Sequence, residues 1–173
     1  MVALTVACCG GAVLYVRPFY DQYPSSSSPG VQVTGLSKVN DAARLKRARQ
    51  LEGKVGDDSL DEDTFAQVYV DAANRQRRVT LVGATRFIWS PEDDLAAMFQ
   101  RLGTVIAIKE IREVDAGPLG GEQRCAAASV DGQAHVLCAW ADHGSTGIVL
   151  ATGSAESTTA EQTRAVRAGV ISR

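Results

Sequence analysis

Two cysteines, Cys125 and Cys138, lie at equal distances along the chain from an Asp131-Gly132 dipeptide. Asp-Gly is favoured at the centre of a two-residue hairpin turn, because that turn needs positive φ at both positions. A hairpin centred there places Cys125 opposite Cys138 on a non-hydrogen-bonded pair, where Cα atoms approach to roughly 4.5 Å. The sequence therefore predicts a cross-strand disulfide, which in turn indicates an oxidising, extracytoplasmic compartment.

The chain opens with an uncharged apolar run, residues 2–16, that ends at Arg17. The run is shorter than the roughly 20 residues that cross a bilayer, and no basic segment precedes it as a signal peptide requires. We interpret residues 1–16 as a transmembrane helix whose beginning is missing, because Tyr20 and Tyr23 follow it and Tyr is enriched at membrane interfaces. On this interpretation the protein is anchored in the cell membrane by its N-terminal segment.

Two other interpretations of the run stay open. Cys8, preceded by the small residue Ala7, could end a lipoprotein signal, although Thr5 stands where such signals prefer leucine. Alternatively, the run is a buried strand or helix of the folded domain. Of these two, only the lipoprotein signal would also attach this end of the chain to a membrane.

A Pro- and Ser-rich stretch follows the apolar run. Arg17-Pro18 ends any helix, and residues 23–30 have the composition of a flexible spacer. We therefore expect residues 17–30 to be a tether. Residues 31–173 are expected to form one extracytoplasmic domain, since a chain of this length suits a single core.

Capping signals and helical spacing of apolar residues predict about three helices. Asp41 suits an N-cap and opens a helix to residue 55, Ser90-Pro91 opens a second that ends at Gly103, and a third spans about 157–171. The residues expected to face the core are Leu95, Met98, Phe99 and Leu102 in the second helix, and Ala160, Thr163, Val166 and Val170 in the third.

Alternation of apolar and polar residues predicts about six strands, at residues 65–72, 78–83, 104–114, 125–130, 133–138 and 148–151. Residues 31–33 could add a short edge strand before Gly35. Several strands follow one another without an intervening helix. This order indicates an α+β fold with a single, mostly antiparallel sheet covered by about three helices.

The charge balance argues against nucleic-acid binding. The formal net charge is −2 at pH 7, whereas nucleic acid calls for a basic patch or stripe. Basic residues do gather in the first predicted helix, at Arg44, Lys46, Arg47 and Arg49, but an acidic run follows at residues 57–63. This pattern favours a solvated helix face over a docking surface.

Trp140, Asp142 and His143 lie at the end of the predicted hairpin and are the candidate binding residues. With Ser145 they also supply an acid, a base and a hydroxyl, but a nucleophilic triad needs its base to bridge the other two groups in space. Neighbours in one turn seldom achieve that, and Asp and Ser are common turn residues. We therefore predict a turn without catalytic residues, a chain that is not an enzyme, and a Trp140 ring that covers the disulfide.

The sequence predicts neither a metal site nor a cofactor. His135 and His143 stand on different stretches with no local acid cluster, and the predicted disulfide leaves no free thiol in the hairpin. The glycines within residues 117–121 follow a strand without opening a helix or carrying a P-loop lysine. They indicate a loop rather than a phosphate site.

Three segments, residues 17–24, 117–121 and 138–143, resemble uncharacterised membrane-anchored proteins of actinomycete bacteria. They read Arg-Pro-Phe-Tyr-Asp-Gln-Tyr-Pro, Gly-Pro-Leu-Gly-Gly and Cys-Ala-Trp-Ala-Asp-His, and the first follows an apolar, Cys-containing run. The resemblance covers most of the chain and implies a cytoplasmic N-terminal side, one membrane helix and an exported domain without assigned activity. Such proteins have a full membrane segment and a cytoplasmic leader, which favours a truncated start here.

These observations predict a membrane-tethered extracytoplasmic domain that acts by binding. Its partner would be another envelope protein, or a small or lipid ligand held between the sheet and the helices. Two alternatives stay open: a cell-envelope hydrolase that uses His143 with Asp142 or Ser145, and a structural subunit of a membrane complex.

Overall fold

The hairpin around Asp131 and Gly132 forms in the predicted register. In the computed structural model, which describes residues 16–29, 32–56 and 62–173, strands β6 (Glu122–Val130) and β7 (Gln133–Ala141) pair antiparallel. Asp131 and Gly132 have φ values of 51° and 77°. Cys125 lies opposite Cys138 with a Cα–Cα distance of 4.1 Å and an S–S distance of 2.00 Å. The predicted disulfide pairing is confirmed.

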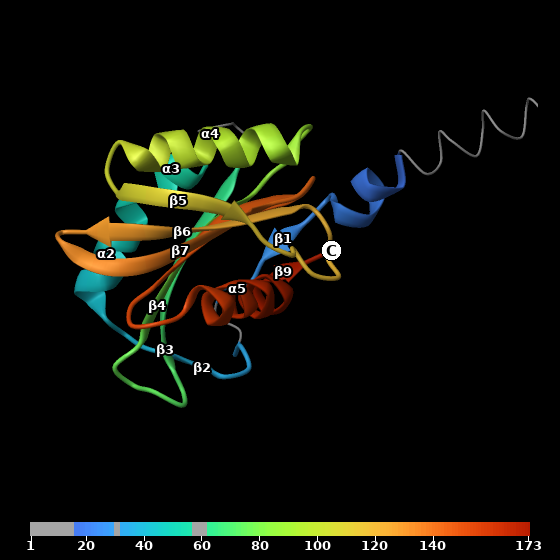
Figure 1. The fold of residues 1–173 in the computed structure, drawn as a ribbon. Helices are drawn as coiled ribbons and strands as arrows, with labels where there is room; N and C mark the ends of the chain where they lie inside the picture. Colours follow the sequence, from blue (N-terminus) through green and yellow to red (C-terminus); the bar gives the residue numbers. More distant parts are fainter. Residues whose placement is uncertain (1–15, 30–31, 57–61) are drawn as a thin grey trace, which may run out of the picture.

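The hairpin belongs to a seven-stranded sheet in which all neighbouring strands are antiparallel, in the order β2-β3-β4-β8-β7-β6-β5 (Figure 1). The other five strands are β2 (Leu36–Lys38), β3 (Asp63–Asp71), β4 (Arg78–Thr85), β5 (Ala107–Glu113) and β8 (Ser145–Ala151). A second sheet joins β1 (Ser26–Ser27) to β9 (Ile171–Ser172).

Besides the helix at residues 16–22, four helices occur in the part of the chain that the structure describes, and these four cover both faces of the large sheet. Helices α2 (Ala42–Gln50), α3 (Glu52–Val55) and α4 (Pro91–Gly103) lie on one face, and α5 (Glu156–Val170) lies on the other (Figure 1). The α+β class and the antiparallel sheet are confirmed. The expected single sheet of about six strands, covered by about three helices, is wrong in its counts. Short elements without a strong pattern in the sequence, such as β1, β2, β9 and α3, raise the numbers of strands, sheets and helices.

The first predicted helix is divided into α2 and α3. Asp41 is its N-cap as predicted, and its carboxylate accepts from the Arg44 N–H at 3.0 Å. At Leu51 the backbone N–H donates to the carbonyl of Ala48, three residues back rather than four, and the helix is interrupted there. This break directs α3 toward α4 and buries Val55 completely.

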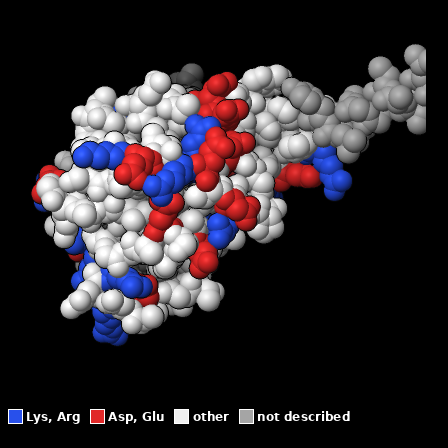
Figure 2. Space-filling view, in the orientation of Figure 1, with Lys and Arg blue, Asp and Glu red and all other residues white. Residues whose placement is uncertain are grey.

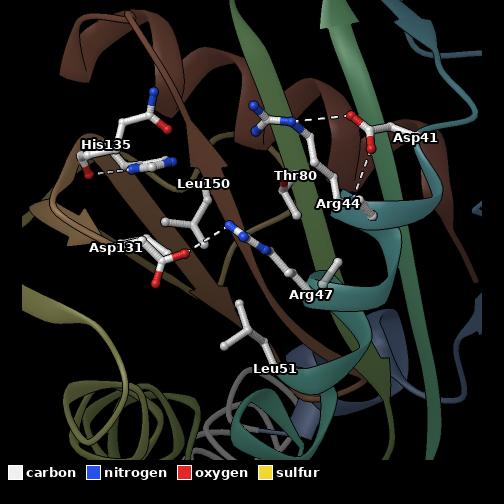
Figure 3. Close-up of a pocket in the computed structure, with 12 residues that line it drawn as sticks. Asp41, Arg44, Arg47, Leu51, Thr80, Asp131, His135 and Leu150 are labelled. Atoms are coloured by element: carbon white, nitrogen blue, oxygen red, sulfur yellow. Dashed lines mark hydrogen bonds and ion pairs between the residues drawn. The ribbon is translucent and has the colours of Figure 1, made fainter.

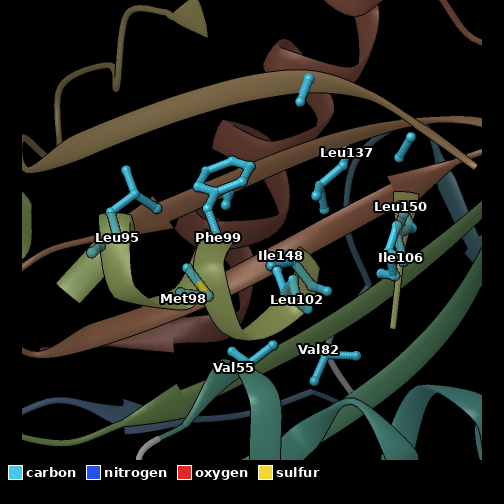
Figure 4. Close-up of a cluster of buried hydrophobic side chains, with 14 of the residues drawn as sticks. Val55, Val82, Leu95, Met98, Phe99, Leu102, Ile106, Leu137, Ile148 and Leu150 are labelled. Carbon is cyan, nitrogen blue, oxygen red and sulfur yellow. The ribbon is translucent and has the colours of Figure 1, made fainter. Parts of the chain in front are cut away.

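Two apolar layers hold the helices to the sheet. The layer beneath α2, α3 and α4 is drawn in Figure 4, and its largest members are Leu95, Met98, Phe99, Leu102, Ile106, Leu137, Ile148 and Leu150. The layer beneath α5 contains Phe65, Tyr69, Leu81, Trp140, Val149, Val166 and Val170, and the disulfide packs against Ala160 beside it. All eight residues predicted to face the core from α4 and α5 are buried.

Residues 32 and 33 do not form the predicted short edge strand. Residue 31 is outside the described residues, and Val33 is buried but not in a strand. The edge strand is β2, which begins one residue after Gly35, whose φ is 78°. The chain therefore pairs with β3 only after the Gly35 turn has redirected it.

The described part of the expected tether, residues 17–29, is packed on the domain. A helix spans residues 16–22, so the prediction that Arg17-Pro18 ends any helix is wrong. β1 pairs with β9, and the Gln22 side chain donates to the Leu119 carbonyl at 3.0 Å and accepts from the His143 N–H at 3.0 Å. Of the expected transmembrane segment, residues 1–15 lie outside the described residues. Within residues 16–29, 32–56 and 62–173, no helix is long and apolar enough to cross a bilayer.

Candidate functional site

The fully buried Asp142 carboxylate is the centre of a polar cluster. Its Oδ2 accepts from Arg167 at 2.6 and 3.1 Å, from Arg173 at 2.8 Å and from the Ser145 hydroxyl at 2.8 Å. Its Oδ1 accepts from the backbone N–H groups of Gly144 and Ser145. Burial lowers the pKa of Arg167 below its ordinary value, and the negative charge of Asp142 offsets part of this effect. A buried carboxylate is costly unless opposite charges and hydrogen bonds compensate it. Arg167 of α5 and Arg173 at the C-terminus provide this compensation, and their contacts with Asp142 join α5 and the C-terminus to the end of β7.

The Ser145 hydroxyl is enclosed and fully engaged. It donates to Asp142, accepts from Trp140 Nε1 at 3.2 Å, and Ser145 has no solvent exposure. The His143 ring lies elsewhere: its Nδ1 donates to the Ile88 carbonyl at 2.8 Å, and its face stacks on Phe19 at 3.8 Å between centroids. Asp142 and Ser145 are thus in contact, but the imidazole does not bridge them as a triad requires.

Of the three candidate binding residues, only His143 borders a cavity. Trp140 and Asp142 are completely buried, so neither can contact a ligand in this conformation. His143 lines an open hollow of about 540 Å³ together with Phe19, Trp89 and other residues of the N-terminal segment, the start of α4 and the start of β6. The predicted turn is therefore mainly a structural element that the N-terminal segment covers.

A second cavity, the α2 pocket, lies between α2 and the sheet near the β6–β7 turn (Figure 3). It has a volume of about 560 Å³. Its lining residues are Asp41, Ala43, Arg44, Arg47, Ala48, Leu51, Thr80, Val130, Asp131, Gln133, His135 and Leu150. Arg44, Arg47, Ala48 and Leu51 share one helix face because they recur at three- and four-residue spacing.

The arginine and aspartate side chains of the α2 pocket lie at its rim (Figure 3). Arg47 extends from α2 to the Asp131 carboxylate at 2.8 Å across the pocket (Figure 3). Arg44 pairs with Asp41 at 3.3 Å, and His135 Nδ1 donates to the Gln133 carbonyl at 2.8 Å.

The Arg47–Asp131 pair is exposed and therefore weak. The two side chains are 70 and 71% exposed, and exposed pairs contribute about 0–1 kcal/mol. Separating them costs little, since water solvates Asp131 on the surface. A ligand anion with two oxygens could then take the place of Asp131 as the partner of the Arg47 guanidinium.

The sequence did not reveal the α2 pocket. The basic residues of α2 were interpreted as a solvated face, and this holds for Lys46 and Arg49, which are exposed and do not line the pocket. Arg44 and Arg47 differ because they lie on the helix face that carries Ala48 and Leu51. The three-residue spacing of Arg44 and Arg47 beside apolar residues was the signal in the sequence that could have indicated a binding face. The opposite wall of the pocket is formed by strands that are distant in the sequence, and this spacing does not reveal them.

Among the residues that the structure describes, no group of three or more His, Cys, Asp or Glu side chains could hold a metal ion. No protein-family model matches this chain, and no curated protein or solved structure matches it at a significant level.

Proposed function

We propose that this chain is a membrane-tethered extracytoplasmic binding module that holds a small amphipathic anion in the α2 pocket. The observation that carries the proposal is the pocket itself, with apolar side chains below and two arginines at the rim. Binding sites for small molecules are typically concave and mostly apolar, with a few polar groups that fix orientation.

The chemistry of the lining selects the ligand class. Leu51, Leu150 and Val130 offer apolar contact to a ring or a short alkyl chain. Arg47 can donate two parallel hydrogen bonds to a phosphate or carboxylate, and charge-assisted bonds of this kind are the stronger ones. A molecule with one apolar end and one anionic end uses both parts of the pocket.

The tether and the compartment rest on other observations. The apolar run at residues 2–16 supports a membrane anchor, and the Cys125–Cys138 disulfide supports an oxidising compartment. The α2 pocket lies at the β6–β7 turn, at the opposite end of the sheet from β1 and the blue N-terminal segment (Figure 1). From His135 to Ala141 alone, the strand extends about 20 Å. On a membrane-anchored chain this places the pocket away from the bilayer, which favours a water-soluble ligand over a membrane lipid.

Titration of the full chain in phosphatidylcholine nanodiscs tests the proposal, with phenyl phosphate, phenol and inorganic phosphate as three matched probes. We expect phenyl phosphate to bind most tightly, because only it offers both a ring and an anion. Methyl resonances of Leu51 and Leu150 should shift on its addition. Equal affinities for phenyl phosphate and inorganic phosphate would contradict an apolar contribution.

Two substitutions on the same helix provide the control. Arg47→Ala should weaken phenyl phosphate binding by about tenfold, or about 1.4 kcal/mol, since one charge-assisted contact is lost. Lys46→Ala removes an equal charge from an exposed residue outside the lining and should leave the affinity unchanged. Equal losses in both variants would indicate general charge attraction and contradict the site.

A further inference from the structure

Exposed aromatic side chains gather where the chain enters the domain. The aromatic patch consists of Phe19, Tyr20, Tyr23, Phe87 and Trp89. Tyr20 is 81% exposed, Trp89 70%, Phe87 45% and Tyr23 39%. Single exposed apolar residues are ordinary on a protein surface, but a contiguous group of large ones marks an interaction surface.

The patch is held together by ring contacts from two segments. Phe19 lies 5.4 Å from Trp89 and 6.1 Å from Phe87 between ring centroids, and Tyr23 meets Phe87 edge-on at 5.3 Å. Phe19 is itself stacked on His143, which Ile88 holds in place. The rings of Phe19, Tyr23, Phe87 and Trp89 are therefore fixed in position by the fold, and Trp89 remains exposed among them.

The sequence places this patch directly beside the expected membrane anchor. The apolar run ends at residue 16, and Tyr20 is only four residues further along a helix that ends at residue 22. Four helical residues advance the chain by about 6 Å. A chain anchored through residues 2–16 therefore holds these rings within the interfacial layer, where Trp and Tyr are favoured.

We propose that the aromatic patch is the surface on which the domain lies against the lipid bilayer, and that Trp89 inserts among the headgroups. This inference rests on the membrane tether of the proposed function. The patch fixes the orientation of the domain, with the α2 pocket directed away from the membrane.

The charges near the patch specify the kind of lipid surface. Acidic side chains gather over the first turn of α4, whereas along β5 two glutamates alternate with one lysine and one arginine (Figure 2). Glu92, next to the patch, is 73% exposed, and Arg17 is paired with Asp21 at 3.3 Å. No excess of basic charge is available there, so contact with a zwitterionic surface is expected without any requirement for anionic lipid.

The two tryptophans of the chain make the proposal measurable. Trp89 is exposed on the patch, whereas Trp140 is completely buried in the core. The full chain is reconstituted into phosphatidylcholine vesicles whose acyl chains are brominated near the headgroup or near the bilayer centre. We expect loss of Trp89 fluorescence that is larger for the shallow bromine, together with protection from acrylamide. A Trp89→Phe variant should show neither effect, because only Trp140 remains.

Substitutions elsewhere on the surface show whether the patch acts as a unit. Phe87→Ser should reduce the quenching of Trp89, because it removes a neighbouring ring from the interface. Ile111→Ser removes an equally exposed apolar side chain from β5, away from the patch, and should leave the quenching unchanged. Adding phosphatidylserine to the vesicles should change the quenching little.

Flotation of the vesicles separates the two proposals. A chain that does not float with vesicles contradicts the tether and with it the bilayer contact. A chain that floats while Trp89 stays unquenched and open to acrylamide contradicts the bilayer contact alone. Trp89 could instead be protected from acrylamide only at high protein concentration, without quenching by the brominated lipids. This result would assign the patch to contact with a second copy of the chain and overturn the inference.

Discussion

The indole ring of Trp140 lies over the backbone of Gly147, the residue directly opposite it on β8, so a Cβ at Gly147 would overlap with the ring. Phe65 and Gly83 form the same arrangement between β3 and β4, and Gly83 is opposite Gly147. Two aromatic rings thus cover two glycines in one row across four strands. The glycines let the rings lie flat on the sheet beneath α5.

We expect Gly147→Ala to lower the free energy of unfolding by about 1–3 kcal/mol, because the added methyl group overpacks the site beneath Trp140. Gly103→Ala is the matched control, since nothing lies within 4 Å of a Cβ there and Gly103 is in helix α4. Urea unfolding measures both. A Gly147→Ala variant as stable as Gly103→Ala would show that the ring can move aside.

The Asp142 cluster should make Arg167 critical for stability. Arg167→Met leaves the buried Asp142 carboxylate without its main partner, which typically costs about 3–5 kcal/mol. Arg173→Ala should cost less, because the Arg173 side chain is 21% exposed and Arg167 still compensates Asp142. Thermal unfolding of the two variants gives the comparison. If Arg173→Ala lost more stability than Arg167→Met, Arg173 and not Arg167 would be the main partner of Asp142.

The disulfide joins residues 13 apart, and removing it should destabilise the domain by about 3 kcal/mol through the loop that it closes in the unfolded chain. The Cys125→Ala, Cys138→Ala double variant tests this without leaving a free thiol in the hairpin. Intact mass after alkylation, with and without reductant, checks the pairing itself. Alkylation of both thiols in non-reduced protein from an oxidising compartment would argue against the compartment inferred here.

Burial raises the pKa of Tyr69, whose hydroxyl donates to the Pro29 carbonyl at 3.2 Å. The unfolded chain ionises this residue near its ordinary value of about 10. Its contribution to stability is therefore complete below about pH 10 and is lost as the pH rises through the higher folded-state pKa.

Tyr69→Phe removes both the hydrogen bond and this pH dependence. We expect the variant to be less stable by about 1 kcal/mol at pH 7. Above about pH 10, however, the stability of the unmodified protein should fall more steeply than that of the variant. Unfolding free energies between pH 7 and pH 11 measure this difference, and parallel curves over that range would contradict it.

The elements that sequence reasoning located correctly depend on neighbours along the chain. The Asp131-Gly132 turn sets the register of its hairpin and hence the Cys125–Cys138 pair, because side chains alternate strictly along paired strands. Ser90-Pro91 begins α4 for an equally local reason, which is the geometry of a helix N-terminus. These signals act between residues close together in the chain, so they can be recognised in the sequence without knowledge of the fold.

The sites were decided by tertiary structure, because their parts are distant in sequence. Arg167 reaches Asp142 only when α5 packs across the sheet, and this contact makes the predicted Asp142 turn a buried structural cluster. Arg47 meets Asp131, 84 residues away, only when α2 lies beside the hairpin tip. By itself the sequence determined the hairpin, its disulfide, the main helices and the α+β class. Which polar residues became buried and which came to line a pocket followed from long-range packing of the helices on the sheet, which no local pattern records.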